Sequence, residues 1–370
     1  MNNQLKEESN LTWAVIGGGN GGQSTAGHLA LMGFPVRLYD IIPETVDAIK
    51  LQGGIRLEGD VVQGFGKLEL ATTSIQEAVK GSDIVMVVTP ALAHRDIARA
   101  CAPYLEDGQV VFIHPGATGG ALEFRKVLDD EQCSADVTIA EAQSLVYACR
   151  SPKPGCANIM GIKKSLMVSA LPSTETERVV KLLNTAYEQM YGGANVLQTS
   201  LENLNAMMHP GPTLLNTSLI ESDRKWKYYY DGITPSIGAF VEEMDRERMA
   251  IGEALGIKLR SVLDWYEIMY GVRENTLSET VRKNDAYAQI QGQKALETRY
   301  ILEDIPMGLV PMLSLARLTG VKADRIETVV KLGQLLLNKD FVKIGRSLEN
   351  LGLSGMDIEQ IHRYLKTGEK

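Results

Sequence analysis

The sequence lacks the features that mark several classes of protein. Its 370 residues include only four cysteines, none in a C-x-x-C pair and none at zinc-ligand spacing from a histidine, which argues against a disulfide scaffold and a zinc site. No run approaches the roughly 18 apolar residues of a membrane span, and residues 1–12 have neither the basic start nor the apolar stretch of a signal peptide. We therefore predict a cytoplasmic protein with free thiols, no bound metal and no membrane partner.

An excess of positive charge is absent as well. Lys and Arg number 38 against 46 Asp and Glu, a net charge of −8, which argues against a nucleic-acid partner because such binding needs a basic surface. The hydrophobic share of 44% allows a real core, and 370 residues suggest two domains at roughly 100–200 residues each. Glycine is the residue in excess: 35 of 370 is between 9 and 10%, against a usual share of about 7%.

Apolar runs and helical patterns alternate in the first half of the chain, and this predicts an α/β sheet. The expected strands are 13–16, 36–40, 83–88, 109–113, 137–140 and 164–170, and the expected helices are 23–32, 74–80, 93–104, 120–128 and 174–190. From residue 201 onward, apolar residues recur at spacings of 3 and 4, as in 237–249 and 326–336, which predicts helices. We therefore expect one domain at 1–199 and a second, helical domain at 200–370. The helical half has enough apolar faces for a homodimer interface, but the sequence does not settle the oligomeric state.

The motif Gly17-x-Gly19-x-x-Gly22 lies between the first expected strand and helix. In this setting the glycines allow a tight turn, close approach of the backbone to a pyrophosphate, and packing of the helix on the strand. The free N–H groups of the helix N-terminus then face the phosphates. A purely structural glycine turn is the alternative. The residues we expect to contact the dinucleotide are Gly17, Gly19, Asn20, Gly21, Gly22, Asp40, Thr89 and Pro90.

Asp40 ends the second expected strand, 18 residues after Gly22, and no arginine follows it closely. A carboxylate there can accept hydrogen bonds from both ribose hydroxyls of NAD and would repel the 2′-phosphate of NADP. We therefore predict NAD(H) rather than NADP(H), the alternative being a solvated acid at a strand end. Residues 89–90 and 114–116 follow later strands, at the edge where ligands bind in such sheets, although Pro and Gly also favour simple turns.

His209 is the sharper catalytic candidate among five histidines, and His114 is a minor one. The helical stretch 201–208 should break at His209, because the residue before a proline disfavours helical conformation. A histidine at such a break would face an interdomain cleft, with Asn205 one turn earlier on the same face. A structural histidine is the alternative. In the segment 299–306, Arg299 could bind a carboxylate with two hydrogen bonds and Asp304 could orient His209. From these residues alone, however, a solvated helix end with a local ion pair is the favoured explanation.

Taken together, these motifs resemble the opine dehydrogenases, the octopine/nopaline dehydrogenase family, over nearly the whole chain. The resemblance rests on GGGNGG at 17–22, HPG at 114–116 with GGALEF at 119–124, AEAQ at 140–143, residues 205–210, and Arg299-Tyr300 followed by Glu303-Asp304-Ile305-Pro306-x-Gly308. The first motif is shared by many dehydrogenases, and the later ones are more specific in this order and spacing.

The resemblance implies an α/β fold with an N-terminal Rossmann dinucleotide-binding domain and an all-helical C-terminal substrate and catalytic domain. It implies NAD(P)H-dependent reductive condensation of an amino acid with a 2-oxo acid such as pyruvate, to an N-(carboxyalkyl) amino acid, and the reverse. It also implies that His209 and Asp304 transfer the proton and that Arg299 binds the oxo-acid carboxylate. By position, Glu141 and Cys149 are expected to line the amino-acid pocket together with Asn205, and Cys149 is not expected to act as a nucleophile.

Two other functions stay open. One is a reductase of a 2-oxo acid or related ketone without an amine partner, of the ketopantoate reductase or glycerol-3-phosphate dehydrogenase kind. Such enzymes often use a lysine as the acid, and no lysine lies between Gln198 and Asp223. The other is a catalytically silent NAD-binding sensor, and the presence of His209, Arg299 and Asp304 together counts against it.

Overall fold

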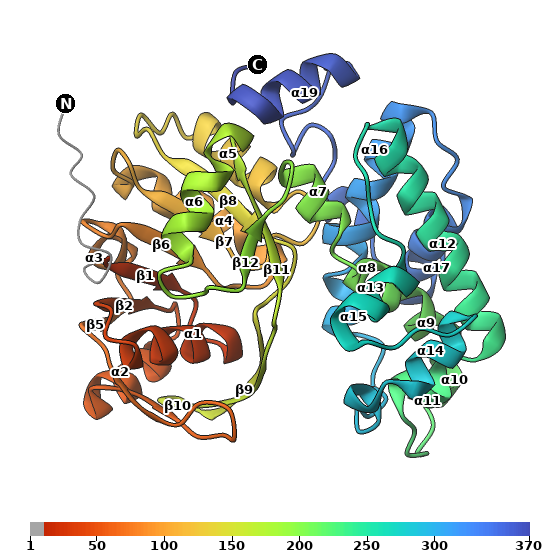
Figure 1. Ribbon diagram of the computed structural model, residues 1–370, viewed down its shortest axis with the longest axis horizontal. Coiled ribbons are helices and arrows are strands. Elements are labelled where there is room, and N and C mark those ends of the chain that lie inside the picture. Colours follow the sequence, from red (N-terminus) through yellow and green to blue (C-terminus); the bar gives the residue numbers. More distant parts are fainter. Residues whose placement is uncertain (1–10) are drawn as a thin grey trace. The chain divides into compact units, whose positions relative to one another are not determined.

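The computed structural model describes residues 11–370, which fall into two compact units (Figure 1). The first unit contains the chain up to Gly116, Gly120–Thr199 and His362–Lys370, and the second contains Ala117–Gly119 and Ser200–Ile361. The prediction of a single helical domain at 200–370 is wrong for the last nine residues. They belong to the first unit, where the Lys370 ammonium lies 2.9 Å from the Asp129 carboxylate.

An eight-stranded sheet forms the centre of the first unit. Its order is β12-β11-β8-β7-β6-β1-β2-β5, and every neighbouring pair is parallel except β8 and β11. The strands are β1 (Trp13–Ile16), β2 (Val36–Tyr39), β5 (Leu70–Thr72), β6 (Ile84–Val87), β7 (Val110–Ile113), β8 (Thr138–Ala142), β11 (Leu166–Leu171) and β12 (Met190–Gly192). All residues of β1, β6 and β7 are buried, which explains their uninterrupted apolar sequences because a parallel sheet is covered on both faces.

The helices that alternate with these strands confirm the α/β class. They are α1 (Asn20–Leu31), α2 (Pro43–Gln52), α3 (Ile75–Val79), α4 (His94–Cys101), α5 (Gly120–Asp130) and α6 (Thr176–Leu183). The helix predicted at 174–190 is too long, since α6 ends at Leu183 and β12 begins at Met190. Leu183, Tyr187 and Met190 have the spacing of one helix face and all are buried. However, Tyr187 lies in the segment between α6 and β12, and Met190 is the first residue of β12. Apolar spacing alone does not separate these cases.

A second, four-stranded sheet in the same unit was not predicted. Its order is β4-β3-β10-β9, with β3 (Gly54–Leu57), β4 (Gly64–Lys67), β9 (Tyr147–Lys153) and β10 (Cys156–Ile162). The pairing of β3 with β10 joins Arg56 to Cys156, so it depends on segments 100 residues apart. The sheet packs closely on α1, because a Cβ on Gly27 would lie 2.9 Å from the Ile55 side chain. It therefore supports the helix that follows the glycine motif.

The second unit is helical, as predicted. Its helices are α8 (Asn205–Met208), α9 (Pro210–Leu215), α10 (Thr217–Ile220), α11 (Tyr228–Gly232), α12 (Pro235–Ala254), α13 (Val262–Tyr270), α14 (Leu277–Lys283), α15 (Arg299–Leu302), α16 (Val310–Thr319), α17 (Asp324–Leu337) and α18 (Phe341–Ile344); α7 (Val196–Leu201) and α19 (Ile358–Thr367) each span both units. The longest, α12, begins with Pro235, and the Thr234 hydroxyl accepts a hydrogen bond from the Ile237 N–H, a favourable helix start.

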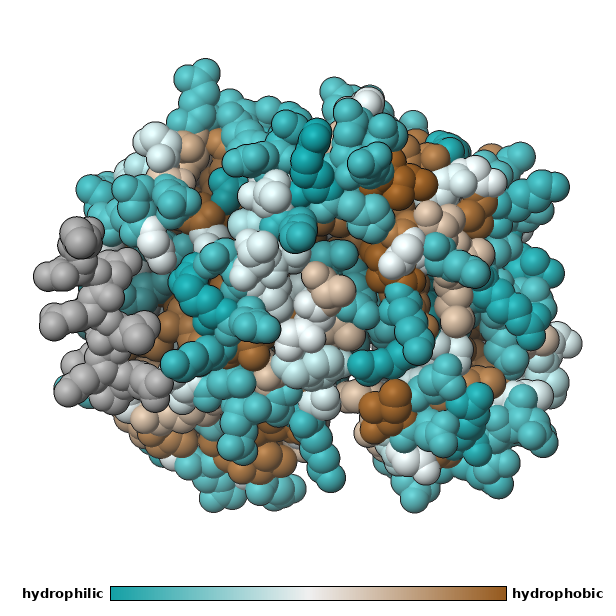
Figure 2. All heavy atoms as spheres, turned by 45° about the horizontal axis from the view of Figure 1, so that its top comes forward, coloured by the Kyte–Doolittle hydropathy of each residue, from teal (hydrophilic) through white to brown (hydrophobic). Residues whose placement is uncertain are grey.

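Among residues 11–370, no helix combines the length and the apolar character needed to cross a bilayer. The face drawn in Figure 2 is mostly hydrophilic, and apolar residues occur on it in separate groups.

Candidate functional site

The glycine motif forms a turn in which side chains are excluded by backbone contacts. Gly17 has φ of +112°, a conformation that favours glycine. A Cβ on Gly22 would lie 1.6 Å from the Gly17 carbonyl oxygen, so no other residue fits this close approach of α1 to β1. A Cβ on Gly19, by contrast, would meet nothing within 4 Å. Gly19 therefore borders open space, as expected where a pyrophosphate approaches the backbone.

The start of α1 is fastened to the second sheet. Gly19 is the N-cap of this 12-residue helix and provides no capping side chain, and no acid lies in the first turn. The Asn20 side-chain oxygen accepts a hydrogen bond of 2.8 Å from the Ser151 N–H on β9. The helix N-terminus therefore retains N–H donors and a positive dipole end for an anion.

Cys149 also contacts this turn, from β9. Its thiol lies 3.5 Å from the Asn20 carbonyl oxygen, and the residue is buried. Burial raises the pKa of the Cys149 thiol above its ordinary value, which keeps it protonated at neutral pH. This placement connects Cys149 with the dinucleotide turn, and its predicted place in an amino-acid pocket stays a prediction.

Asp40 and Thr89 both lie next to the turn. The Asp40 carboxylate accepts hydrogen bonds from the backbone N–H groups of Gly18 and Ile42. Thr89, just after β6, is close to Gly17, because a Cβ on Gly17 would lie 2.9 Å from the Thr89 methyl group. In the described residues the buried Thr89 hydroxyl has no hydrogen-bond partner, so it is available to a ligand, and the neighbouring Pro90 is exposed.

Glu141 and His114 are buried and form hydrogen bonds with other groups of the protein. Glu141 is fully buried, and its carboxylate accepts hydrogen bonds from the Ala121 N–H and the Thr199 hydroxyl, both at 2.8 Å. This does not support the prediction that Glu141 lines the amino-acid pocket. His114 is fully buried as well, and its Nε2 accepts a hydrogen bond from the Val146 N–H. Burial and the nearby Lys163 lower the pKa of His114 to about 3, so it is neutral and a poor acid–base candidate.

His209 and Asp304 meet in the helical unit although 95 residues separate them in the sequence. The His209 Nδ1 lies 2.7 Å from the Asp304 Oδ2. His209 lies at the junction of α8 and α9, where Pro210 starts the second helix, so the predicted break occurs at this residue. Asp304 precedes a π-helical turn, Ile305–Leu309, a rare geometry that is frequent at functional sites.

Burial affects the carboxyl group of this pair. The Asp304 and His209 side chains are 15% and 12% exposed. Burial raises the pKa of Asp304 above its ordinary value, and the hydrogen bond from His209 opposes this rise. Because Nδ1 is engaged by Asp304, Nε2 is the ring nitrogen that remains for proton exchange.

Two tyrosines surround the His209 ring. Tyr300 stacks on it with a centroid distance of 3.7 Å and an interplanar angle of 1°, and Tyr228 approaches edge-on at 6.4 Å. The Tyr228 hydroxyl also lies 2.9 Å from the His209 carbonyl oxygen and 2.9 Å from the Thr213 hydroxyl. Neither ring contact with His209 was predicted from the sequence. The only signal for Tyr300 was its place next to Arg299.

Arg299 and Asn205 are the two remaining candidates in this unit. Arg299 is the first residue of α15; its side chain is 73% exposed and forms an ion pair with the Glu303 carboxylate one turn later. This is the local ion pair that the sequence left as an alternative. It also leaves most of the guanidinium accessible to a carboxylate. Asn205 is exposed at the start of α8, and its carbonyl oxygen accepts the His209 N–H.

Known proteins match most of the chain. Residues 192–337 match the family described as NAD/NADP octopine/nopaline dehydrogenase, alpha-helical domain, and residues 13–149 match the ketopantoate reductase PanE/ApbA family. An opine dehydrogenase of Arthrobacter sp. (strain 1C) is 42% identical over 345 residues, which cover 93% of this chain and 96% of that protein.

Solved structures share the fold. An octopine dehydrogenase in complex with NADH and agmatine has a TM-score of 0.82 at 21% identity and covers 98% of this chain and 99% of its own. A yersinopine dehydrogenase with bound NADP+ has a TM-score of 0.73 at 15% identity, with the same coverage.

Proposed function

This chain belongs to the opine dehydrogenase family, and we propose that it catalyses the NAD(P)H-dependent reductive condensation of an amino acid with a 2-oxo acid. The product is an N-(carboxyalkyl) amino acid, and the reverse reaction is the oxidation of that secondary amine. The observation that carries the proposal is the 2.7 Å contact between His209 and Asp304, in a chain that is 42% identical to an opine dehydrogenase over 93% of its length.

The glycine turn fits a dinucleotide, because Gly19 borders open space and the first turn of α1 carries no acid. The bound nicotinamide would supply a hydride to the carbon of the imine that the two substrates form. The hydroxyl of Thr89 and the carboxylate of Asp40 are two polar groups beside the turn. Asp40 is proposed to hold the ribose hydroxyls.

His209 is proposed to move the proton through Nε2. While Nδ1 donates to the Asp304 carboxylate, a protonated ring can give a proton to the departing oxygen as the imine forms. In the reverse direction the neutral ring accepts a proton from the attacking water or the amine. Asp304 stabilises the charged ring and fixes its tautomer. Arg299 is proposed to hold the oxo-acid carboxylate with two parallel hydrogen bonds, and Asn205 to contact the substrates.

One experiment tests the reaction. The protein is incubated with NADH, pyruvate and a mixture of amino acids, and secondary-amine products are sought by mass spectrometry. We expect a new mass that requires both substrates. Equal consumption of NADH with pyruvate alone would favour an oxo-acid reductase instead, the class that the match of residues 13–149 to ketopantoate reductases suggests. Binding of NADH without turnover on a broad substrate panel would favour a sensor.

The preferred cofactor is proposed to be NADH. The Asp40 carboxylate already accepts two backbone N–H groups at the turn, so it is held in place and would repel a 2′-phosphate. The ratio of kcat/KM for NADH to that for NADPH should exceed about tenfold, and Asp40→Ser should reduce this ratio by about tenfold or more. A wild-type preference for NADPH would contradict the role given to Asp40. A homodimer also stays a proposal, which light scattering of the purified protein would test.

A further inference from the structure

A separate cavity of about 580 Å³ lies within the N-terminal unit and is not used by the proposed reaction. Its walls come from α1, from the end of β10 and from the segment between α6 and β12, elements marked in Figure 1. The lining residues are His28, 162–164 and 184–189. The volume lies in the range of small-molecule sites.

The cavity carries more positive than negative groups. Lys163 and Lys164 line it, and Glu188 is its only acid. Burial lowers the pKa of His28, and the His28 Nδ1 lies 2.8 Å from the Tyr147 hydroxyl, so this imidazole is neutral at neutral pH.

The Lys163 ammonium has a hydroxyl partner, and in the described part of the chain it has no counter-ion. Its Nζ donates a hydrogen bond of 2.5 Å to the Ser144 hydroxyl, and within residues 11–370 no carboxylate lies within 4 Å of it. An ammonium has three donors, so two are left for a ligand. Burial lowers the pKa of Lys163 to about 8, and the group is therefore still charged at pH 7.

The backbone around Lys163 is held in place. The Lys163 N–H donates to the Val146 carbonyl oxygen at 2.9 Å, and the Val146 N–H donates to the buried His114 at 2.9 Å. The backbone from which the Lys163 side chain extends is therefore fixed by hydrogen bonds. A preorganised group loses less entropy when a ligand binds.

A half-buried ammonium without a counter-ion can gain from a bound anion, because charges removed from water are normally paired. We propose that this cavity binds a small organic carboxylate, with the Lys163 ammonium as its counter-ion. A carboxylate suits the site better than a phosphate dianion, because the lining also includes the acid Glu188 beside Lys163 and the exposed Lys164. The inference does not rest on the proposed dehydrogenase reaction.

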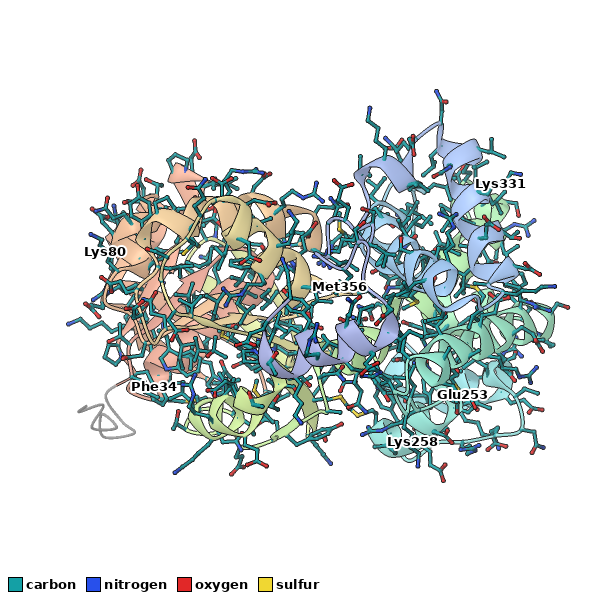
Figure 3. The ribbon with its side chains drawn as sticks, turned by 90° about the horizontal axis from the view of Figure 1, so that it is seen from above. Phe34, Lys80, Glu253, Lys258, Lys331 and Met356 are labelled. Carbon is teal, nitrogen blue, oxygen red and sulfur yellow. The ribbon has the colours of Figure 1, made fainter. Side chains whose placement is uncertain are left out.

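Binding can be measured without turnover. Lactate is titrated by calorimetry into Arg299→Met protein, so that the proposed substrate arginine does not contribute, and inorganic phosphate is a parallel arm at matched ionic strength. We expect saturable lactate binding with a Kd of about 1–10 mM, and weaker binding of phosphate. The double variant Arg299→Met/Lys163→Met should bind lactate at least tenfold more weakly than the Arg299→Met protein does. Adding Lys80→Met, which removes an exposed lysine of the same unit (labelled in Figure 3), should change lactate binding less than twofold.

Two further measurements separate a ligand site from a structural lysine. Ser144→Ala leaves the ammonium in place and should keep lactate binding within about threefold. Lys163→Met should melt no lower than its parent in a buffer without carboxylates, because it removes an unpaired charge. The proposal is overturned by absent lactate binding in the Arg299→Met protein, by unchanged binding after Lys163→Met, by tighter binding of phosphate than of lactate, or by failure of Lys163→Met to fold.

Discussion

The dinucleotide turn and the histidine–aspartate pair achieve their geometry in opposite ways. The turn consists of consecutive residues, and it depends on the absence of side chains at Gly17 and Gly22. The pair joins two side chains 95 residues apart. Backbone clearance is therefore visible in a short motif, whereas a contact between distant side chains becomes visible only when the helices are packed.

The turn is broken most severely by a methyl group at Gly22. Gly22→Ala would place a Cβ 1.6 Å from the Gly17 carbonyl oxygen, and backbone on both sides cannot move without opening the turn. We expect a loss of at least about 4 kcal/mol in the free energy of unfolding, measured by urea denaturation, together with the loss of NADH binding.

Gly19→Ala is the matched control for this change. Its Cβ would meet nothing within 4 Å and its φ of −74° suits any residue, so the free energy of unfolding should fall by about 1 kcal/mol or less. NADH affinity should still fall about tenfold or more, because the methyl group would stand where the pyrophosphate approaches. Equal stability losses in the two variants would remove the distinction between a packing glycine and a ligand-facing glycine.

The same contrast explains what the sequence revealed. Six of the eight strands of the main sheet were predicted from their apolar sequences, whereas the three-residue strands β5 and β12 were not. The glycine turn was predicted because its motif is contiguous. The sheet β4-β3-β10-β9 escaped prediction because β4 and β9 are largely exposed and lack apolar runs, and because its two local pairs are joined only by the pairing of β3 with β10, about 100 residues apart. Glu141 was assigned to a substrate pocket from its position at a strand end, but the Ala121 N–H and the Thr199 hydroxyl, distant in sequence, engage its carboxylate.

The pair is tested by removing one side chain at a time. His209→Gln removes the proposed proton carrier and should lower kcat by about 10²–10⁴-fold. Asp304→Asn keeps the size of the side chain and loses its charge, so it should lower kcat by a smaller factor, about 10–10³-fold. Steady-state kinetics give kcat, and the melting temperature and the NADH affinity should stay close to the wild-type values in both variants. Normal turnover by His209→Gln would show that the proton moves by another group.

Removing the ring of Tyr300 that stacks on His209 should lower kcat less than changing His209 or Asp304 does. Tyr300→Phe keeps the ring that lies 3.7 Å from the imidazole, and kcat should stay within about threefold of wild type. Tyr300→Leu loses the stacking, worth about 0.5–1.5 kcal/mol for an aromatic pair, so kcat should fall about 2- to 12-fold with little change in KM. A change in KM alone would instead place Tyr300 with Arg299 in substrate binding.

Lys163 extends the comparison to a charge that neither the motifs nor the fold explains. Burial lowers the pKa of Lys163 from 10.5 to about 8, so between these values the unfolded chain binds more protons than the native one, and stability rises with pH. The advantage of Lys163→Met over wild type should therefore be largest below pH 8 and disappear near pH 10.5. Urea unfolding of both proteins at several pH values measures this difference, in which the other titrating groups cancel. Saturating lactate should make this stability difference depend less on pH, because a bound carboxylate would raise the pKa of the Lys163 ammonium again. A stability difference that is independent of pH without lactate would mean that Lys163 is well solvated in the native state.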